Sequence, residues 1–165
     1  MKTGSWLALS GVIIVLDQLT KHVVARTFAV GEAVTVTPFL NLVFVYNTGA
    51  AFSFLSDQPG WQRWFFIMIA LAASAWIVYL LRRYPHARLF ALALALVLAG
   101  ALGNVIDRIF YGAVVDFLDF HAYGYHWPAF NVADSAITCG AALLIWDALK
   151  PGQKDEARTM KEGGV

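Results

Sequence analysis

Four apolar stretches dominate this chain, and each is long enough to cross a membrane as a helix. They cover about residues 6–24, 61–81, 89–110 and 131–149. A helix needs ~20 apolar residues to span the ~30 Å hydrocarbon layer of a bilayer. Hydrophobic residues make up 59% of the chain and charged residues 14%, whereas a soluble domain has ~25% charged residues. The sequence therefore predicts an all-α membrane protein with four transmembrane helices.

The length of 165 residues fits a single domain. We expect residues 1–150 to form one four-helix domain and residues 151–165 to form a charged, disordered cytoplasmic tail. The net charge of +1 gives no reason to expect a nucleic-acid partner. The only cysteine, Cys139, excludes an internal disulfide and a cysteine-rich metal site.

Residues 27–55 are less apolar and are rich in strand-forming residues. Their partial alternation on both sides of Pro38 predicts two or three short strands. Because the edges of open strands cannot lie unpaired in lipid, we expect a small extracytoplasmic β-sheet at the outer membrane surface. The small residues at 47–53 either let a ligand or another element approach closely or form an ordinary turn, and composition alone favours the turn.

The distribution of basic residues predicts the orientation in the membrane. Eight lysines and arginines lie on one side of the four segments, and two, Arg26 and Arg63, lie on the other. The eight are Lys2, Arg82, Arg83, Arg88, Lys150, Lys154, Arg158 and Lys161. Since basic residues accumulate on the cytoplasmic side, both termini should be cytoplasmic and the sheet should face outward.

With that topology, polar residues that are far apart in the sequence gather near the outer ends of the segments. They are Asp17, Lys21, Asn47, Asn104, Asp107, Arg108, Asn131 and Asp134. The inner halves of the segments nearly lack such residues, so solubility does not explain the pattern, and a shared polar site does. Asp17 and Lys21 are four residues apart and can pair on one helix face, either as a structural ion pair or as part of that site.

The stretch of residues 112–135 carries Asp116, Asp119 and Asp134 between the last two apolar segments. If these segments are antiparallel neighbours, Asp116 and Asp134 come together. Asp119, three residues beyond Asp116, should point elsewhere if that stretch is extended or irregular. Two close carboxylates share a proton, so one can take a proton from water while the other donates to a scissile carbonyl. The spacing is weakly specific, and aspartates that only cap helices are an equal alternative.

Other chemistries have weaker support in the sequence. A nucleophile at Ser135 lacks a Gly-x-Ser-x-Gly motif, and Cys139 is interpreted as a small packing residue. An ion pathway normally places carboxylates near the membrane midplane, whereas here they are expected near one surface. A metal site stays open, although the histidines lie in an aromatic loop and suit the membrane interface better. Its candidate ligands are Asp116, Asp119, His121, His126 and Asp134.

Five motifs in order resemble the lipoprotein signal peptidase family (signal peptidase II). They are residues 17–21 (DQLTK), 47–52 (NTGAAF), 100–108 (GALGNVIDR), 114–117 (VVDF) and 130–134 (FNVAD). Trp127-Pro128 also fits the family, and the resemblance covers residues 17 to about 149. It implies four transmembrane helices with a small outer sheet, in agreement with the hydropathy.

The resemblance implies an aspartyl endopeptidase of the bacterial inner membrane. Such an enzyme cleaves the signal peptide from diacylglyceryl-modified prolipoproteins, on the amino side of the lipidated cysteine, without cofactor or metal. By motif match, Asp116 and Asp134 are the catalytic pair. The motif residues expected to support the site or to contact substrate or the inhibitor globomycin are Asp17, Lys21, Asn47, Gly49, Asn104, Arg108 and Asn131. We expect a monomer; the rival interpretation is a non-enzymatic membrane scaffold or small transporter.

Overall fold

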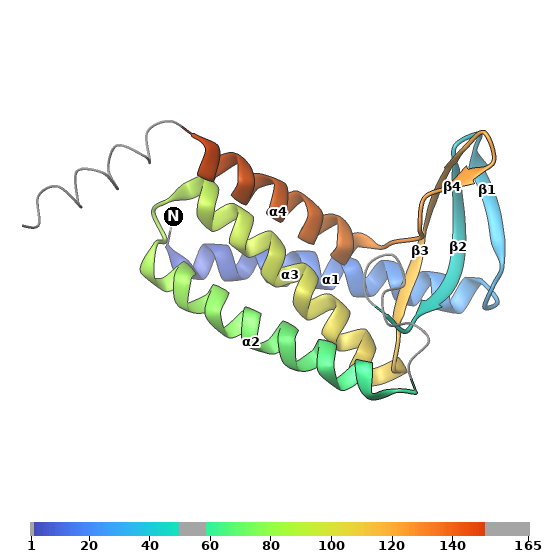
Figure 1. Cartoon of the computed structure of the whole chain (residues 1–165), viewed down its shortest axis with the longest axis horizontal. Helices are drawn as coiled ribbons and strands as arrows, with labels where there is room; N and C mark the ends of the chain where they lie inside the picture. Colours follow the sequence, from blue (N-terminus) through green and yellow to red (C-terminus); the bar gives the residue numbers. More distant parts are fainter. Residues whose placement is uncertain (1, 50–58, 151–165) are drawn as a thin grey trace, which may run out of the picture.

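The computed structural model describes residues 2–49 and 59–150 (Figure 1). The predicted tail at 151–165 and part of the small-residue stretch at 47–53 lie outside the described residues. Within these described residues, four helices and four strands follow one another. They are α1 (Thr3–Thr27), β1 (Ala33–Thr37), β2 (Leu40–Asn47), α2 (Trp61–Arg83), α3 (Arg88–Tyr111), β3 (Val114–Ala122), β4 (Tyr125–His126) and α4 (Val132–Leu149).

All four helices are long and apolar enough to cross a membrane, which confirms the four predicted spans. α1 to α3 extend a few residues beyond the predicted apolar stretches, because polar and basic residues at the ends, such as Arg82 and Arg83, continue the helices. Figure 1 shows the helices side by side, with the start of α1 and the end of α4 at one end of the bundle and the sheet at the other. The sheet and the helix ends next to it therefore lie at the same end of the molecule.

Glycines on α3 and α4 let the helices approach closely and make room for the site. A Cβ atom at Gly140 would lie 2.7 Å from the carbonyl oxygen of Ala93, so α4 packs directly on the backbone of α3. A Cβ at Gly103 would lie 2.7 Å from Oδ2 of Asp17. The small residues that the sequence places on one face of α3 thus admit a carboxylate from α1 into the bundle.

The strands form one antiparallel sheet in the order β1-β2-β3-β4. β1 and β2 confirm the strands predicted within residues 27–55, whereas β3 and β4, within residues 112–135, are strands that the sequence pattern does not predict. The register pairs Leu42 with Leu118, a contact between distant parts of the chain. Val115 and Phe117 on β3 pack with Val24 of α1 and hold the base of the sheet against the end of that helix.

One packing prediction is wrong. Cys139 is exposed on α4, and its neighbour Gly140 makes the close contact with α3 instead. Successive residues of a helix point about 100° apart, so the packed face passes through Gly140 and leaves Cys139 on the outer surface of the bundle.

Candidate active site

The first turn of α4 holds the carboxylate of Asp134 in place. Asn131 is the N-cap: its side-chain oxygen accepts a hydrogen bond from the backbone N–H of Asp134 (2.9 Å), and one oxygen of Asp134 accepts from the backbone N–H of Asn131 (3.3 Å). This reciprocal pair is a capping box. The other oxygen of Asp134 accepts from the side-chain amide of Asn104 on α3 (2.8 Å). Asp134 therefore caps its helix and also faces α3.

Asp116 lies on β3 and is almost completely buried, with 2% of its surface exposed. One carboxylate oxygen accepts from the side-chain amide of Asn131 (2.7 Å) and the other from that of Asn47 (3.1 Å). Burial and then the nearby carboxylate of Asp134 raise the pKa of Asp116 to about 7, although the two amides and the charge of Lys21 oppose the shift. Asp116 is thus a carboxyl group that holds a proton near neutral pH.

Three asparagines direct their NH₂ groups at these two carboxylates, and a second contact fixes the orientation of each amide. The oxygen of Asn131 is held by the N–H of Asp134, that of Asn47 by the N–H of Gly49 (2.9 Å), and that of Asn104 by Nζ of Lys21 (3.0 Å). An amide whose oxygen is occupied in this way presents only donors on its other side. Asn131 contacts both aspartates and so couples β3 to the start of α4.

A buried ion cluster contacts one of the three amides, that of Asn104, through Lys21. Nζ of Lys21 is 2.8 Å from a carboxylate oxygen of Asp17 and 2.8 Å from one of Asp107. All three side chains are buried. The predicted pairing of Asp17 with Lys21 is confirmed. Asp107, which was expected among the gathered polar residues but not among the motif residues that support the site, is an equal partner. One lysine thus compensates two buried carboxylates and orients an amide that contacts the candidate pair.

Gln18 is a further residue that the sequence analysis missed as part of the site. Its side-chain NH₂ donates to both carboxylates of the ion cluster and to the carbonyl of Gly103. The same carboxylates bind the backbone: Asp17 accepts from the N–H of Ala133 (2.8 Å), and Asp107 accepts from that of Val115 (3.1 Å). The cluster therefore ties α1 and α3 to the two segments that carry the aspartate pair. Gln18 lies within the first motif that resembles the family (residues 17–21), and this position is the sign in the sequence that it could belong to the site.

Arg108 connects α3 to the segment after β2. Its guanidinium donates to the carbonyl of Gly49 (2.7 Å) and lies 5.1 Å from the centre of the Phe66 ring on α2. The guanidinium of Arg108 thus binds a backbone carbonyl, whereas the neighbouring Asp107 binds Lys21. Arg108 thus fixes Gly49, whose N–H in turn orients Asn47 toward Asp116.

We expect Arg108→Lys to lower turnover about tenfold or more while the protein stays folded. Lysine keeps the charge but lacks the planar fork that reaches Gly49 and lies over Phe66. The measurement is the rate of the peptide cleavage that the family resemblance implies, with the melting temperature as a control for folding. Arg83→Lys, at the other end of the bundle, is the matched control and should leave the rate unchanged. Full activity of Arg108→Lys would show that charge alone suffices at this position.

Asp119 belongs to a different environment from Asp116. Strand alternation places it on the opposite face of β3, where it accepts from Asn41 (2.9 Å) and contacts Nδ1 of His126 (2.9 Å). Burial raises the pKa of Asp119, but the hydrogen bonds from Asn41 and His126 and the charge of the histidines outweigh that effect and bring the pKa below its usual value. Asp119 therefore points away from the pair, as predicted.

The remaining candidate residues from the sequence are also placed. His121 stacks on His126 with ring centres 5.1 Å apart, on the Asp119 side of the sheet. The proposed metal ligands are therefore divided between two faces, and within residues 2–49 and 59–150 no three of these side chains form a metal-binding group. The hydroxyl of Ser135 donates to the backbone carbonyl of Asn131 (2.9 Å), within the first turn of α4.

Comparison with known proteins identifies relatives along most of the chain. The model of the family described as signal peptidase (SPase) II matches residues 9–150. A lipoprotein signal peptidase of Burkholderia mallei is 59% identical over 145 residues, covering 88% of this chain and 87% of the relative. A lipoprotein signal peptidase of Ralstonia nicotianae is 60% identical over 147 residues, covering 89% and 85%.

Solved structures share the fold as well. A bacterial membrane enzyme determined at 2.3 Å by the in meso method superposes with a TM-score of 0.82 at 36% identity, covering 92% of this chain and 91% of that one. A second such structure, at 1.9 Å, has a TM-score of 0.80 at 35% identity and covers 90% and 94%. The similarity therefore extends over both the helices and the sheet.

Proposed function

Because the chain belongs to the signal peptidase II family of lipoprotein-processing membrane proteases, we propose that Asp116 and Asp134 are its catalytic pair. In this proposal the enzyme cleaves the signal peptide from diacylglyceryl-modified prolipoproteins, on the amino side of the lipidated cysteine. The observation that carries the proposal is the convergence of three oriented amides on two carboxylates, one of which has a pKa of about 7. Such a pair can supply an acid and a base together.

The two aspartates have different roles in the proposed reaction. Asp134 takes a proton from a water molecule, whose oxygen attacks the scissile carbonyl carbon. Asp116 gives its proton to the carbonyl oxygen, which becomes the hydroxyl of a tetrahedral intermediate. When the C–N bond breaks, the proton held by Asp134 passes to the leaving amine, and the hydroxyl proton returns to Asp116. No covalent enzyme intermediate and no cofactor enters the scheme.

Asn47, Asn104 and Asn131 are proposed as positioning residues for this reaction. Each is fixed by a second contact, so the carboxylates are held before substrate arrives and need little reorganisation. Arg108 and the ion cluster of Asp17, Lys21 and Asp107 hold the elements that carry them. Globomycin, the inhibitor implied by the family resemblance, is proposed to occupy this same site.

The proposed location is the bacterial inner membrane, with both termini in the cytoplasm. The excess of lysine and arginine at the end of the bundle opposite the sheet supports this orientation. It brings the aspartate pair close to the periplasmic surface. A substrate whose cysteine carries a diacylglyceryl anchor has its scissile bond at that depth, because the acyl chains hold the cysteine at the membrane surface.

The test is cleavage of a lipid-modified precursor peptide by the purified protein in detergent, measured from acid to alkaline pH. We expect a bell-shaped profile, since the reactive pair carries one proton. Activity should be present below about pH 7, where Asp116 is protonated, and should be lost above it. Chelators should leave the rate unchanged. Loss with a chelator and recovery with zinc would favour the metal interpretation instead.

Asn47→Ala provides a signed check on the same profile. It removes a hydrogen bond that lowers the pKa of Asp116, so the pKa should rise and the alkaline limb should move to higher pH, with a lower maximum. Both limbs belong to the coupled pair and not to one residue. An alkaline limb that stays in place or moves to lower pH would show that the protonation of Asp116 does not contribute to it.

A further inference from the structure

The β3–β4 hairpin holds two histidines side by side, on the face of the sheet opposite Asp116. His121 of β3 lies directly across from His126 of β4. The next pair along the hairpin is hydrogen-bonded, because the N–H of Trp127 donates to the carbonyl of Phe120 (2.7 Å). Since hydrogen-bonded and non-hydrogen-bonded pairs alternate in an antiparallel ladder, the histidines form a non-hydrogen-bonded pair, in which side chains lie closest. Their ring centres are 5.1 Å apart.

A chain of hydrogen bonds across the four strands of the sheet orients one of these imidazoles. The hydroxyl of Thr35 donates to the side-chain oxygen of Asn41 (2.9 Å), whose NH₂ group donates to Asp119 (2.9 Å). Both carboxylate oxygens of Asp119 lie 2.9 Å from Nδ1 of His126. The carboxylate favours the tautomer with hydrogen on Nδ1, which leaves the lone pair of Nε2 free for a ligand. A carboxylate behind an imidazole is the usual support of a metal-binding histidine.

The second imidazole has an unsatisfied ring nitrogen. Nε2 of His121 is buried and has no hydrogen-bond partner among the described residues. Buried polar atoms in native structures nearly always have a partner, so an orphan of this kind indicates a bound water or ion. The pair can be reached from solvent, because the side chain of His126 is 55% exposed. Figure 1 shows β3 running from the end of α3 to the tip of the sheet, where β4 turns back, so the histidines lie at that tip.

We propose that His121 and His126 bind a divalent late transition metal ion, such as Zn²⁺ or Cu²⁺, at the tip of the sheet. Imidazole suits these ions, and zinc lies ~2.0–2.1 Å from the nitrogen that binds it. Each ring supplies one nitrogen, Asp119 orients His126, and water fills the remaining positions. Within residues 2–49 and 59–150 no three His, Cys, Asp or Glu side chains form a metal-binding group, so the site has two protein ligands. The bound ion joins β4 to β3.

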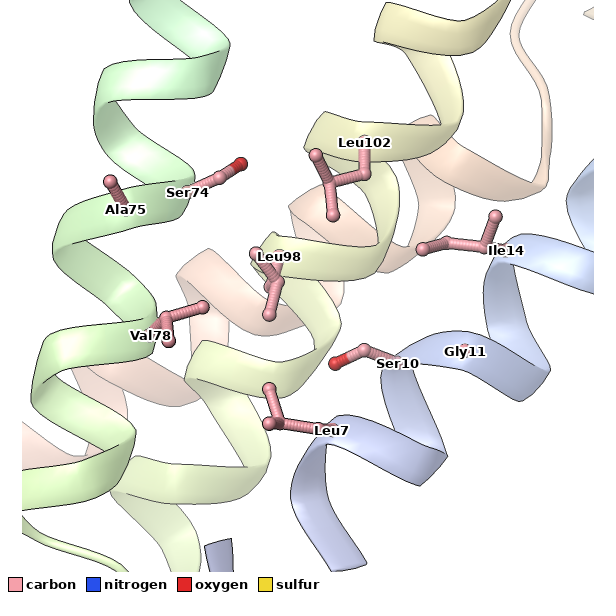
Figure 2. A pocket seen from close by; sticks show the side chains of 9 residues that line it. All are labelled: Leu7, Ser10, Gly11, Ile14, Ser74, Ala75, Val78, Leu98 and Leu102. Atoms are coloured by element: carbon pink, nitrogen blue, oxygen red, sulfur yellow. The ribbon is translucent and has the colours of Figure 1, made fainter. Parts of the chain in front are cut away.

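The groove in the helix bundle lacks such ligands. Figure 2 shows this groove, with a volume of about 480 Å³, between α1, α2 and α3. Its lining is aliphatic except for the hydroxyls of Ser10 and Ser74, and that of Ser10 donates to the carbonyl of Ala95 (2.8 Å). Because neither an imidazole nor a carboxylate lines the groove, it offers a transition metal no suitable ligand. Metal bound by the protein should therefore depend on the hairpin.

Calorimetric titration of Zn²⁺ into the whole protein in detergent, near neutral pH, tests the site. The chain has four histidines, so it should be purified with a tag that contains none. We expect saturable binding of one ion per chain. His121→Ala and His126→Ala should each weaken binding about tenfold or more, since each removes a ligand. His22→Ala and His86→Ala remove the two histidines outside the hairpin; these matched controls should bind zinc like the parent protein.

Electron paramagnetic resonance of the parent protein with one equivalent of Cu²⁺ needs no substitution, so it decides the question even if a hairpin variant fails to fold. The spectrum should show hyperfine coupling to two imidazole nitrogens. Coupling to fewer than two, the absence of saturable zinc binding, or parent-like affinity in both hairpin variants would overturn the proposal. So would loss of binding in His22→Ala or His86→Ala. The proposal does not rest on the proposed reaction, and removal of zinc should leave the cleavage rate unchanged.

Discussion

Asp116→Asn and Asp134→Asn should each abolish nearly all cleavage of a lipid-modified precursor, by about a thousandfold or more. A side-chain amide at position 116 is too weak an acid to give a proton to the scissile carbonyl oxygen. An amide at position 134 is too weak a base to take a proton from water. The matched control is Asp119→Asn, a carboxylate three residues away on the opposite face of β3. It should keep most of the activity. Loss of activity in Asp119→Asn at full stability, with activity kept in Asp116→Asn, would reverse the assignment.

The two inactive variants should stay folded. The pKa of Asp116 is raised in the folded protein, so the folded state loses stability as pH rises from about 4 to about 7. Asp116→Asn removes that cost, and in return loses one of two hydrogen-bond acceptors for the neighbouring amides, worth about 1 kcal/mol. We therefore expect the melting temperature at neutral pH to stay within about 4 °C of the parent protein. A large drop would indicate that the loss of activity reflects unfolding.

Lys21→Met should have the largest effect on stability. It leaves the carboxylates of Asp17 and Asp107 buried without a cation, and breaking a buried pair in this way costs about 3–5 kcal/mol. A drop in melting temperature of about 10 °C is expected in detergent or nanodiscs. Turnover should also fall in the remaining folded protein, because Lys21 orients Asn104 toward Asp134.

Asp17→Asn is the contrasting variant for the ion cluster. It leaves one lysine with one carboxylate, so the buried charges balance, and its amide oxygen can still accept from the N–H of Ala133. It should therefore be clearly more stable than Lys21→Met. Equal stability of the two variants, or a Lys21→Met protein as stable as the parent, would show that the cluster is not the structural support inferred here.

The helices could be predicted from the sequence, because hydropathy over about 20 residues depends only on local composition. The sheet could be predicted only in part. β1 and β2 are close in the sequence, whereas β3 pairs with β2 from far along the chain, and its aspartates interrupt the apolar pattern that marks a strand. Asp116 and Asp119 are tolerated in β3 because each meets hydrogen-bonding partners, on opposite faces of the sheet.

For the site, the sequence predicted which residues gather but not how they connect. Topology and charge were enough to place Asp17, Asn104 and Asp134 at one depth. The partners of each side chain depend on small rotations of the helices, which no spacing rule specifies. Hydropathy also gave no reason to expect that Gln18 contacts both carboxylates of the ion cluster, or that Asn131 contacts both aspartates.

The most direct test of the central claim is the cleavage rate of the Asp116→Asn/Asp134→Asn double variant beside the two single variants. If the aspartates act as one pair with one shared proton, the first substitution already removes nearly all of the activity that the pair provides. The double variant should then be hardly slower than either single variant. If their effects multiply, so that the double variant is slower by about the product of the single losses, the two aspartates contribute independently and the shared-proton mechanism is contradicted.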